Sequence, residues 1–257
     1  MSDTPRTGSM REFIGRLFFS NIPEKPLGHN VLTNQWGRFK AVWNNELDPP
    51  SDAIGIERIL KLALVALQFP FPGIYVRAVS GRRGVLSKHL GIELYVLFKI
   101  LLAVIILSLQ LFNFGSLSWY LNIFFWLVAY MIVESVLYTA TLVFCNDVFA
   151  KPRSYKRNIL LLLCDYTEVV VDFASLYLIV GGLRFTCEGC TYVSRSIDAA
   201  YFSFVTAITI GYGDIVVSTD FGKALVIAQT IIFLIYGVLF LNFYISRIEE
   251  PKSKDME

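Results

Sequence analysis

Charged residues and histidines are scarce in this chain of 257 residues. Only 17% of the residues are charged, whereas 55% are hydrophobic, and the formal net charge is +2. So small a positive charge gives no indication of nucleic-acid binding, and the two histidines, His29 and His89, lie too far apart in the sequence to suggest a histidine metal site. The mean hydropathy of +0.55 exceeds that of an ordinary soluble domain. The composition therefore predicts a membrane protein.

The start of the chain lacks a predicted signal peptide. Met1 to Arg16 is polar and contains no apolar core followed by a cleavage site, so insertion is expected to depend on internal helices. We expect residues 1–91 to form a cytoplasmic N-terminal region and residues 248–257 a cytoplasmic tail.

A short amphipathic helix is predicted near the end of the N-terminal region, over Ile54–Leu67. Arg58 and Lys61 are expected on one side of this helix and leucines on the other, and Pro70 ends it soon after Leu67. The run is too short to cross a membrane, so we expect it to lie in the cytoplasmic interface. The alternative is a broken membrane span that continues to Val79.

Four apolar runs are each long enough to cross a hydrocarbon core about 30 Å thick. They are Ile92–Phe114, Trp119–Phe144, Ile159–Leu183 and Phe221–Ile245. Lysines and arginines gather before the first run, between the second and third, and after the fourth, whereas the loop Gly115–Ser118 is uncharged. Since basic residues favour the cytoplasmic side, the sequence predicts a multi-pass integral protein, most readily of the plasma or cell membrane, with both termini in the cytoplasm.

None of these runs has the charge pattern of a voltage sensor. Such a helix needs Arg or Lys at every third position, because gating work comes from moving several charges through the field. The first run carries a lone Lys99 and the second a lone Glu134. Direct voltage sensing is therefore not expected.

The stretch Thr206–Asp214 reads Thr-Ala-Ile-Thr-Ile-Gly-Tyr-Gly-Asp. Gly211 and Gly213 can adopt left-handed conformations, so alternate peptide units can turn until the carbonyls of residues 209–212 point one way. Four such ladders around one axis could replace the hydration shell of a potassium ion. A phosphate-binding loop is disfavoured because the lysine of that motif is missing.

Thr209-Ile-Gly-Tyr-Gly-Asp214 resembles the selectivity-filter signature of the tetrameric potassium channels. The resemblance covers about a third of the chain and implies a pore module at 157–247, built from an outer helix, a pore helix, the filter and an inner helix, with two peripheral transmembrane helices at 92–147. It implies an all-α membrane protein with four transmembrane helices and a re-entrant pore helix and filter loop, assembled as a homotetramer in the lipid bilayer. Potassium would be the permeant ion, with no other cofactor and no enzymatic activity.

The resemblance also implies roles for single residues. The backbone oxygens of the filter would bind K+, and four further residues would support the filter. The ion-binding residues are Thr209, Ile210, Gly211, Tyr212 and Gly213, with K+ held mainly at the first four, and the supporting residues are Tyr201, Phe202, Thr206 and Asp214. The rival interpretation is a non-conducting accessory or scaffold subunit that keeps the pore-loop fold.

The run Ser196–Ile208 is predicted to form the pore helix. Ser196 is expected to cap it, and Asp198 in its first turn suits the positive end of the helix dipole. Phe202 stands where the family often has an indole that bonds the filter tyrosine, and phenylalanine cannot donate a hydrogen bond. We expect Tyr201 to donate a hydrogen bond to Asp214 instead.

The inner helix departs from the family in its hinge. Phe233 stands where the family often has a hinge glycine. Gly237, one turn later, could act as a hinge or as a helix-packing residue.

Asp165, Glu168 and Asp172 form an acidic stripe along one face of the third run. Acidic groups in a membrane are costly unless they are paired or hydrated. The stripe could sense protons or cations for the pore, or it could pair structurally with basic residues, for which Lys99, Lys156 and Arg157 are the candidates.

Cys187 and Cys190 lie three residues apart in the predicted outer loop, which faces an oxidising compartment. A disulfide between them, a metal site shared with a second subunit and free thiols all remain open. A zinc site within one chain would lack two ligands.

Overall fold

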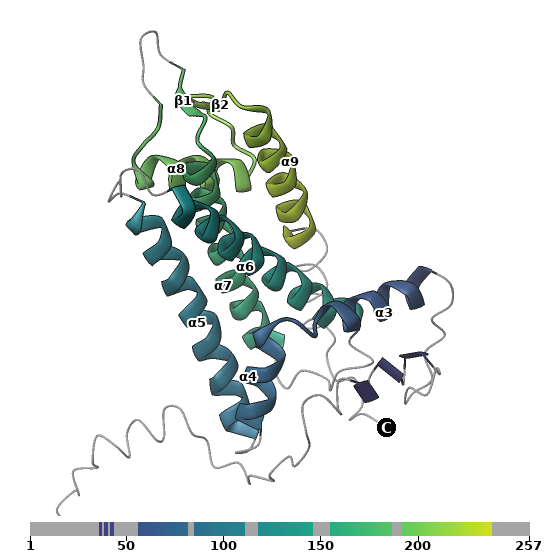
Figure 1. The fold of residues 1–257 in the computed structure, drawn as a ribbon. Coiled ribbons are helices and arrows are strands. Elements are labelled where there is room, and N and C mark those ends of the chain that lie inside the picture. The colour runs from purple at the N-terminus through teal and green to yellow at the C-terminus, as the bar shows by residue number, and fades with distance from the viewer. Residues whose placement is uncertain are drawn as a thin grey trace, which may run out of the picture.

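The computed structural model describes residues 56–81, 85–110, 118–145, 155–186 and 192–237, with three pairs of residues between 36 and 43. The described chain is mostly helical, as predicted (Figure 1). Its elements are α3 (Ile56–Leu67), α4 (Pro72–Gly81), α5 (Val85–Leu109), α6 (Ser118–Phe144), α7 (Tyr155–Val180), β1 (Leu183–Phe185), α8 (Ser196–Ala207), β2 (Ile215–Val217) and α9 (Asp220–Leu234). Cys187 and Cys190, for which a disulfide, a shared metal site and free thiols are open, lie outside the described residues.

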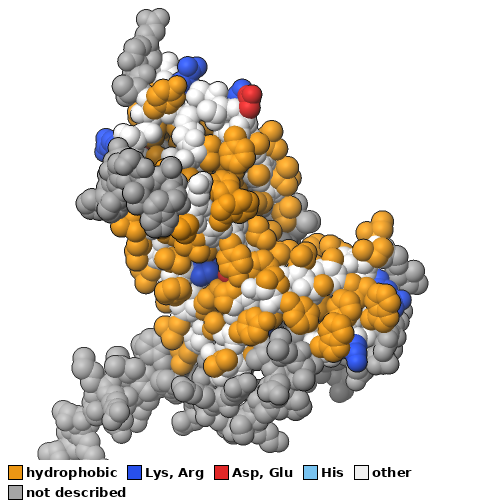
Figure 2. Space-filling model, viewed as in Figure 1, with side chains coloured by type: hydrophobic (Ala, Val, Ile, Leu, Met, Phe, Trp, Pro, Cys, Tyr) orange, Lys and Arg blue, Asp and Glu red, His pale blue; other side chains and the backbone are white. Residues whose placement is uncertain are grey.

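Three of the described helices are long and apolar enough to cross a membrane. They comprise Leu90–Leu109 in α5, Leu121–Thr141 in α6, and Asp220–Gly237, which contains α9. Hydrophobic side chains cover much of the visible surface (Figure 2), as expected for helices that meet lipid. The rest of the predicted fourth run, beyond residue 237, lies outside the described part of the chain.

Helix α7 is the predicted third span, and its 26 residues make it about 39 Å long. It is absent from the three spans found by length and composition, because its acidic stripe interrupts the apolar run. It packs against α5, α6, α8 and α9, so the long helix with the most buried acidic groups is enclosed by the others. The helix ends three residues before the predicted end, because Gly181 and Gly182 adopt φ values of +71° and +90°.

Helices α3 and α4 meet at a break that contains Pro70 and are bent by 76° relative to each other. Pro72 is the first residue of α4, where its missing N–H costs no helical hydrogen bond. Helix α4 runs beside α5, while α3 contacts α6 (Figure 1). By length and composition the pair can count as one broken span, so both the interfacial and the broken-span interpretations of this segment stand.

The prediction that Lys61 lies on an exposed polar side of α3 is wrong. Its side chain is buried, while Ile56 and Ile59 are exposed. Leu64 lies on the same helical face as Lys61, so packing this face into the protein buries the lysine as well. Glu57 compensates the charge through an ion pair of 2.8 Å.

The main hydrophobic core forms where α5 to α9 meet. Phe233, at the position of the missing hinge glycine, is buried there, and its ring centroid lies 4.6 Å from that of Tyr166. Gly237 lies in a π-helical turn, and a Cβ atom added to it would meet no described atom within 4 Å. A packing role for Gly237 within the described chain therefore has no support, and its role as a hinge remains a prediction.

Strands β1 and β2 pair in antiparallel fashion on either side of the predicted filter in sequence. Leu183 lies opposite Val217, and Phe185 lies opposite Ile215. Because β2 begins directly after Asp214, this small sheet holds the C-terminal end of the predicted filter segment against the helices.

Candidate ion-binding site

Helix α8 leads directly into the predicted filter, as expected for a pore helix. The predicted cap is wrong, however, because Ser196 is the first helical residue and Arg195 occupies the N-cap without a side-chain hydrogen bond. The Ser196 hydroxyl instead donates to the carbonyl of Leu107 in α5, at 2.7 Å. The serine hydroxyl thus bonds a carbonyl of another helix instead of capping its own helix. This bond anchors the start of α8 to α5. Asp198 lies in the first turn, as predicted.

Left-handed residues alternate along the filter segment. Thr209, Gly211 and Gly213 have φ values of +57°, +61° and +77°, and the two residues between them do not share this conformation. Such alternation turns successive peptide units in a regular way, which is the backbone geometry that a carbonyl ladder needs. The two glycines were predicted for it. Thr209 was not, because a β-branched residue rarely adopts positive φ.

The inner end of this segment is tied to α8 by backbone hydrogen bonds. The Thr209 amide donates to the carbonyl of Thr206 at 3.1 Å, and the Ile210 amide donates to that of Val205 at 3.0 Å. These bonds hold the C-terminal turn of α8 against the first filter residues. Through its carbonyl, Thr206 therefore supports the base of the segment.

Thr186, just after β1, ties down the outer end. Its amide donates to the Asp214 carbonyl at 2.9 Å, and its hydroxyl donates to the Gly213 carbonyl at 2.6 Å. Between these two ties, every residue from 208 to 214 is exposed in the single subunit. Hydrogen bonds therefore hold both ends of the segment, while the residues between them remain exposed.

The ring of Tyr212 stacks on that of Tyr201 in α8. The ring centroids are 6.3 Å apart and the ring planes differ by 2°. Desolvation and then the nearby Asp214 carboxylate raise the pKa of the Tyr201 phenol. The predicted hydrogen bond between them remains a prediction. Phe202 packs edge-on against the ring of Tyr177, with centroids 5.0 Å apart.

The acidic stripe of α7 faces α5 and α6. Glu168 forms a buried ion pair of 3.0 Å with Lys99 and accepts a hydrogen bond from Ser135. The predicted structural pairing with Lys99 is therefore confirmed for Glu168. Asp165 accepts from Thr139 at 3.5 Å. Of the other two candidate cations, Arg157 pairs with Glu93, and the side chain of Lys156 lies outside the described part.

Asp172 differs from its neighbours in the stripe. Its side chain is fully buried, and neither carboxylate oxygen has a hydrogen-bond partner among the described residues. Lys99 and Glu168 are its charged neighbours. A carboxylate in this position would be an uncompensated buried charge unless it bound a proton or a cation.

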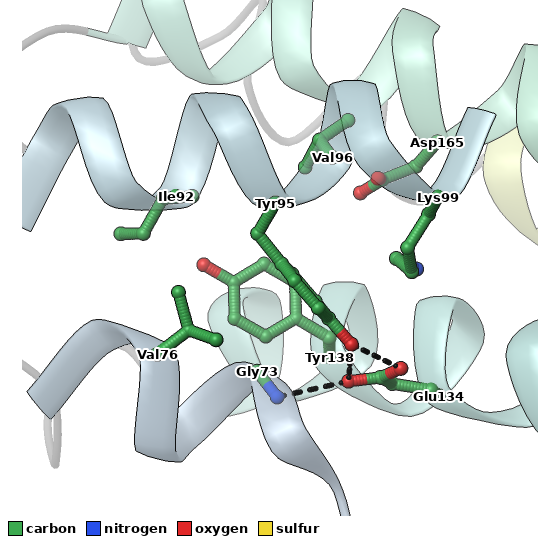
Figure 3. A pocket seen from close by; sticks show the side chains of 9 residues that line it. All are labelled: Gly73, Val76, Ile92, Tyr95, Val96, Lys99, Glu134, Tyr138 and Asp165. Carbon is green, nitrogen blue, oxygen red and sulfur yellow. Dashed lines mark hydrogen bonds between the residues drawn. The ribbon is translucent and has the colours of Figure 1, made fainter. Parts of the chain in front are cut away.

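A small pocket lies beside the stripe, between α4, α5, α6 and α7 (Figure 3). Lys99, Asp165 and Glu134 contribute to its wall. Glu134 accepts hydrogen bonds from the Gly73 amide at 3.0 Å and from the Tyr95 hydroxyl at 2.8 Å. The lone glutamate of the second span is thus bound to the first turn of α4.

Sequence reasoning missed one group of residues near the filter: Gln229 of α9, Tyr177 of α7 and Ser203 of α8. They form a fully buried hydrogen-bonded group. A glutamine within an apolar inner helix was the available signal, because buried amides require partners.

Known proteins resemble the C-terminal part of this chain. Residues 172–250 match a family model described as an ion channel. The chain is also 48% identical, over 58 residues, to two-pore potassium channel 4 of Arabidopsis thaliana, a match that covers 23% of this chain and 19% of the relative. The chain thus spans about a fifth of the length of the curated relative that it matches. No solved structure matches it.

The match encloses α8, which is the predicted pore helix, together with the left-handed segment and α9. These elements carry the candidate site. In this region the chain is therefore similar to ion channels, and to a potassium channel in particular.

Proposed function

We propose that this chain is a subunit of a potassium-selective channel that conducts K+ passively through a central pore. The observation that carries the proposal is the alternation of left-handed residues at Thr209, Gly211 and Gly213. It supports a ladder of backbone oxygens from residues 209–213 as the ion-binding site, which replaces water around a dehydrated cation. Potassium is the permeant ion, and the site has no catalytic residue and requires no other cofactor.

The pore requires four copies of the chain. One ladder reaches an ion from one side only, so a ring of ladders is needed to surround it. The exposure of every residue from 208 to 214 in a single subunit supports this arrangement, because neighbouring copies would cover these residues. We therefore propose a homotetramer, with α5 and α6 at its periphery and the bilayer around it.

The channel does not sense voltage directly, since the described long helices have no regular series of basic residues. The distribution of basic residues in the sequence supports cytoplasmic termini and a place in the plasma or cell membrane.

A flux assay on the full chain in liposomes tests this function. We expect K+ to leave loaded vesicles while Na+ is retained. Absence of K+ flux under all conditions would instead favour the rival function, a non-conducting scaffold subunit. Gly211→Ala should abolish K+ flux without preventing assembly, because a Cβ atom opposes the left-handed backbone.

Gly181→Ala is the matched control. Gly181 also has positive φ, +71°, and an added Cβ would meet nothing within 4 Å, but it lies outside the filter. The two variants therefore carry similar backbone strain. Loss of flux in both would indicate a general effect of strain, and selective flux in Gly211→Ala would contradict the filter assignment.

We also propose that the acidic stripe of α7 senses protons for the pore. Asp172 supports this role, because a buried carboxyl group that lacks a hydrogen-bond partner among the described residues is a place where a proton or a cation could bind. The charged groups that face the stripe are Lys99 on α5 and Glu134 on α6. With one lysine near four carboxyl groups, a change in protonation would alter the charge held between α5, α6 and α7. Movement at Gly237 would complete the response as a hinge in the inner helix.

A further inference from the structure

Gln229 lies at the point where three helices of the pore domain meet. It projects from α9 and is fully buried. Its side-chain oxygen accepts a hydrogen bond of 2.6 Å from the Tyr177 hydroxyl of α7. Its side-chain nitrogen donates to the carbonyl and to the hydroxyl of Ser203 in α8, both at 2.9 Å. One side chain therefore bonds the outer, pore and inner helices together.

Ser203 completes the group of bonds. Its hydroxyl donates to the Val170 carbonyl of α7 at 2.7 Å while it accepts from Gln229. Both donor hydrogens and the acceptor of the amide thus have partners, and so do both hydroxyl groups. A buried amide is costly when its atoms lack partners, but a fully bonded group is rigid and specifies one arrangement of the helices.

The position of this group relates it to the filter. Ser203 lies on the helix that ends at Ala207, and the left-handed segment begins two residues later at Thr209. The adjacent Phe202 packs edge-on against Tyr177, so an aromatic contact reinforces the same junction between α7 and α8. Any shift of α8 relative to α9 would move the base of the filter segment and break these bonds.

We propose that Gln229 is a positioning residue that fixes the pore helix between α7 and α9 and thereby keeps the filter in its conducting shape. The inference rests on the proposed function, because it concerns the stability of a conducting filter. Gln229 touches no permeant ion in this role. It acts through Ser203 and the backbone of α8.

The test uses Gln229→Met in the full-length protein, recorded as single channels in planar bilayers. Methionine keeps the length of the side chain but cannot replace its hydrogen bonds. We expect assembly to remain, while open times before filter closure shorten by about tenfold or more, because the variant loses all three hydrogen bonds of the amide and one buried bond alone corresponds to about tenfold. Relative Na+ permeability should rise as well, which a role in assembly alone would not cause.

Thr167→Val provides the control. Thr167 is exposed on α7, and its hydroxyl bonds only the Leu163 carbonyl of its own helix. Its removal should leave open times and selectivity unchanged. Wild-type open times and selectivity in assembled Gln229→Met channels would overturn the inference, while absence of K+ current in the wild-type protein would overturn the proposed function instead.

Tyr177→Phe keeps the inference testable if Gln229→Met does not assemble. It removes one hydroxyl, retains the ring that contacts Phe202, and should shorten open times severalfold. Where both single variants assemble, the double variant should add little to the effect of Gln229→Met, because the two side chains share one bond. Wild-type open times in Tyr177→Phe, or fully additive effects in the double variant, would contradict a joint role.

Discussion

Helix α7 takes part in two buried polar groups that differ in how completely their atoms are paired. Toward α8 and α9, Tyr177 belongs to a neutral group in which every side-chain polar atom has a partner. Toward α5 and α6, Glu168 and its neighbours form a charged group in which several carboxylate oxygens have none among the described residues. A complete neutral group favours one rigid geometry, whereas an incomplete charged group changes its energy when a proton binds. Helix α7 thus connects a neutral group suited to holding the helices rigidly with a charged group suited to responding to protons.

The largest effect should come from removing the cation of the charged group. Lys99→Met leaves Glu168 buried without its ion-pair partner, and breaking such a pair costs about 3–5 kcal/mol. We expect a marked fall in the thermal unfolding temperature of the full-length protein in detergent. Lys223→Met is the control, since the ion pair of Lys223 with Asp220 is exposed and should contribute less than about 1 kcal/mol. An equal fall in unfolding temperature in both variants would show that the buried ion pair stabilises the protein no more than the exposed one.

A smaller effect should follow from breaking the neutral group. Ser203→Ala leaves the Val170 carbonyl without its side-chain donor and removes one of the two acceptors of the Gln229 amide, at a cost of about 1–3 kcal/mol. The same unfolding measurement applies. Ser108→Ala is matched to it, because the Ser108 hydroxyl is exposed and bonds its own helix. Unchanged stability in Ser203→Ala would show that the neutral group does not hold the helices.

Glu168→Gln separates sensing from support. It keeps the size of the side chain and removes its charge, so it should shift or abolish any pH dependence of channel opening. Stability should change less than in Lys99→Met, because Asp165 and Asp172 remain near the lysine. Recordings across a range of pH measure the response. An unchanged pH response in a well-assembled Glu168→Gln channel would end the sensor hypothesis.

The smallest effect is expected at the filter surface, where Tyr201 is partly exposed. Tyr201→Phe removes the predicted hydrogen bond to Asp214 but keeps the ring that stacks on Tyr212. Ion preference should be intact and openings a few fold shorter. Asp214→Asn should act in the same way, and the double variant should add little. Additive effects in single-channel recordings would show that the two residues do not act as a pair.

The sequence was sufficient where the chemistry of a residue determines its backbone. Gly211 and Gly213 could be assigned to left-handed positions because glycine alone adopts them readily. The sequence was insufficient where contacts between distant parts of the chain determine the hydrogen-bond partner of a residue. Ser196 is a good cap by residue type, yet it bonds Leu107, which lies 89 residues away. The pairing of Gln229 with Tyr177, 52 residues apart, likewise depends on how the helices pack, which no local pattern encodes.

The bend between α3 and α4 has an electrical consequence. The Gly73 amide, in the first turn of α4, meets the carboxylate of Glu134 on α6, so the positive end of one helix dipole compensates a charge that another helix carries among apolar residues. Straightening the pair would move that amide away and leave Glu134 with the Tyr95 hydroxyl as its described donor. The bend is therefore stabilised electrostatically, and a displacement of α4 at this bend would also change the environment of the charge on α6.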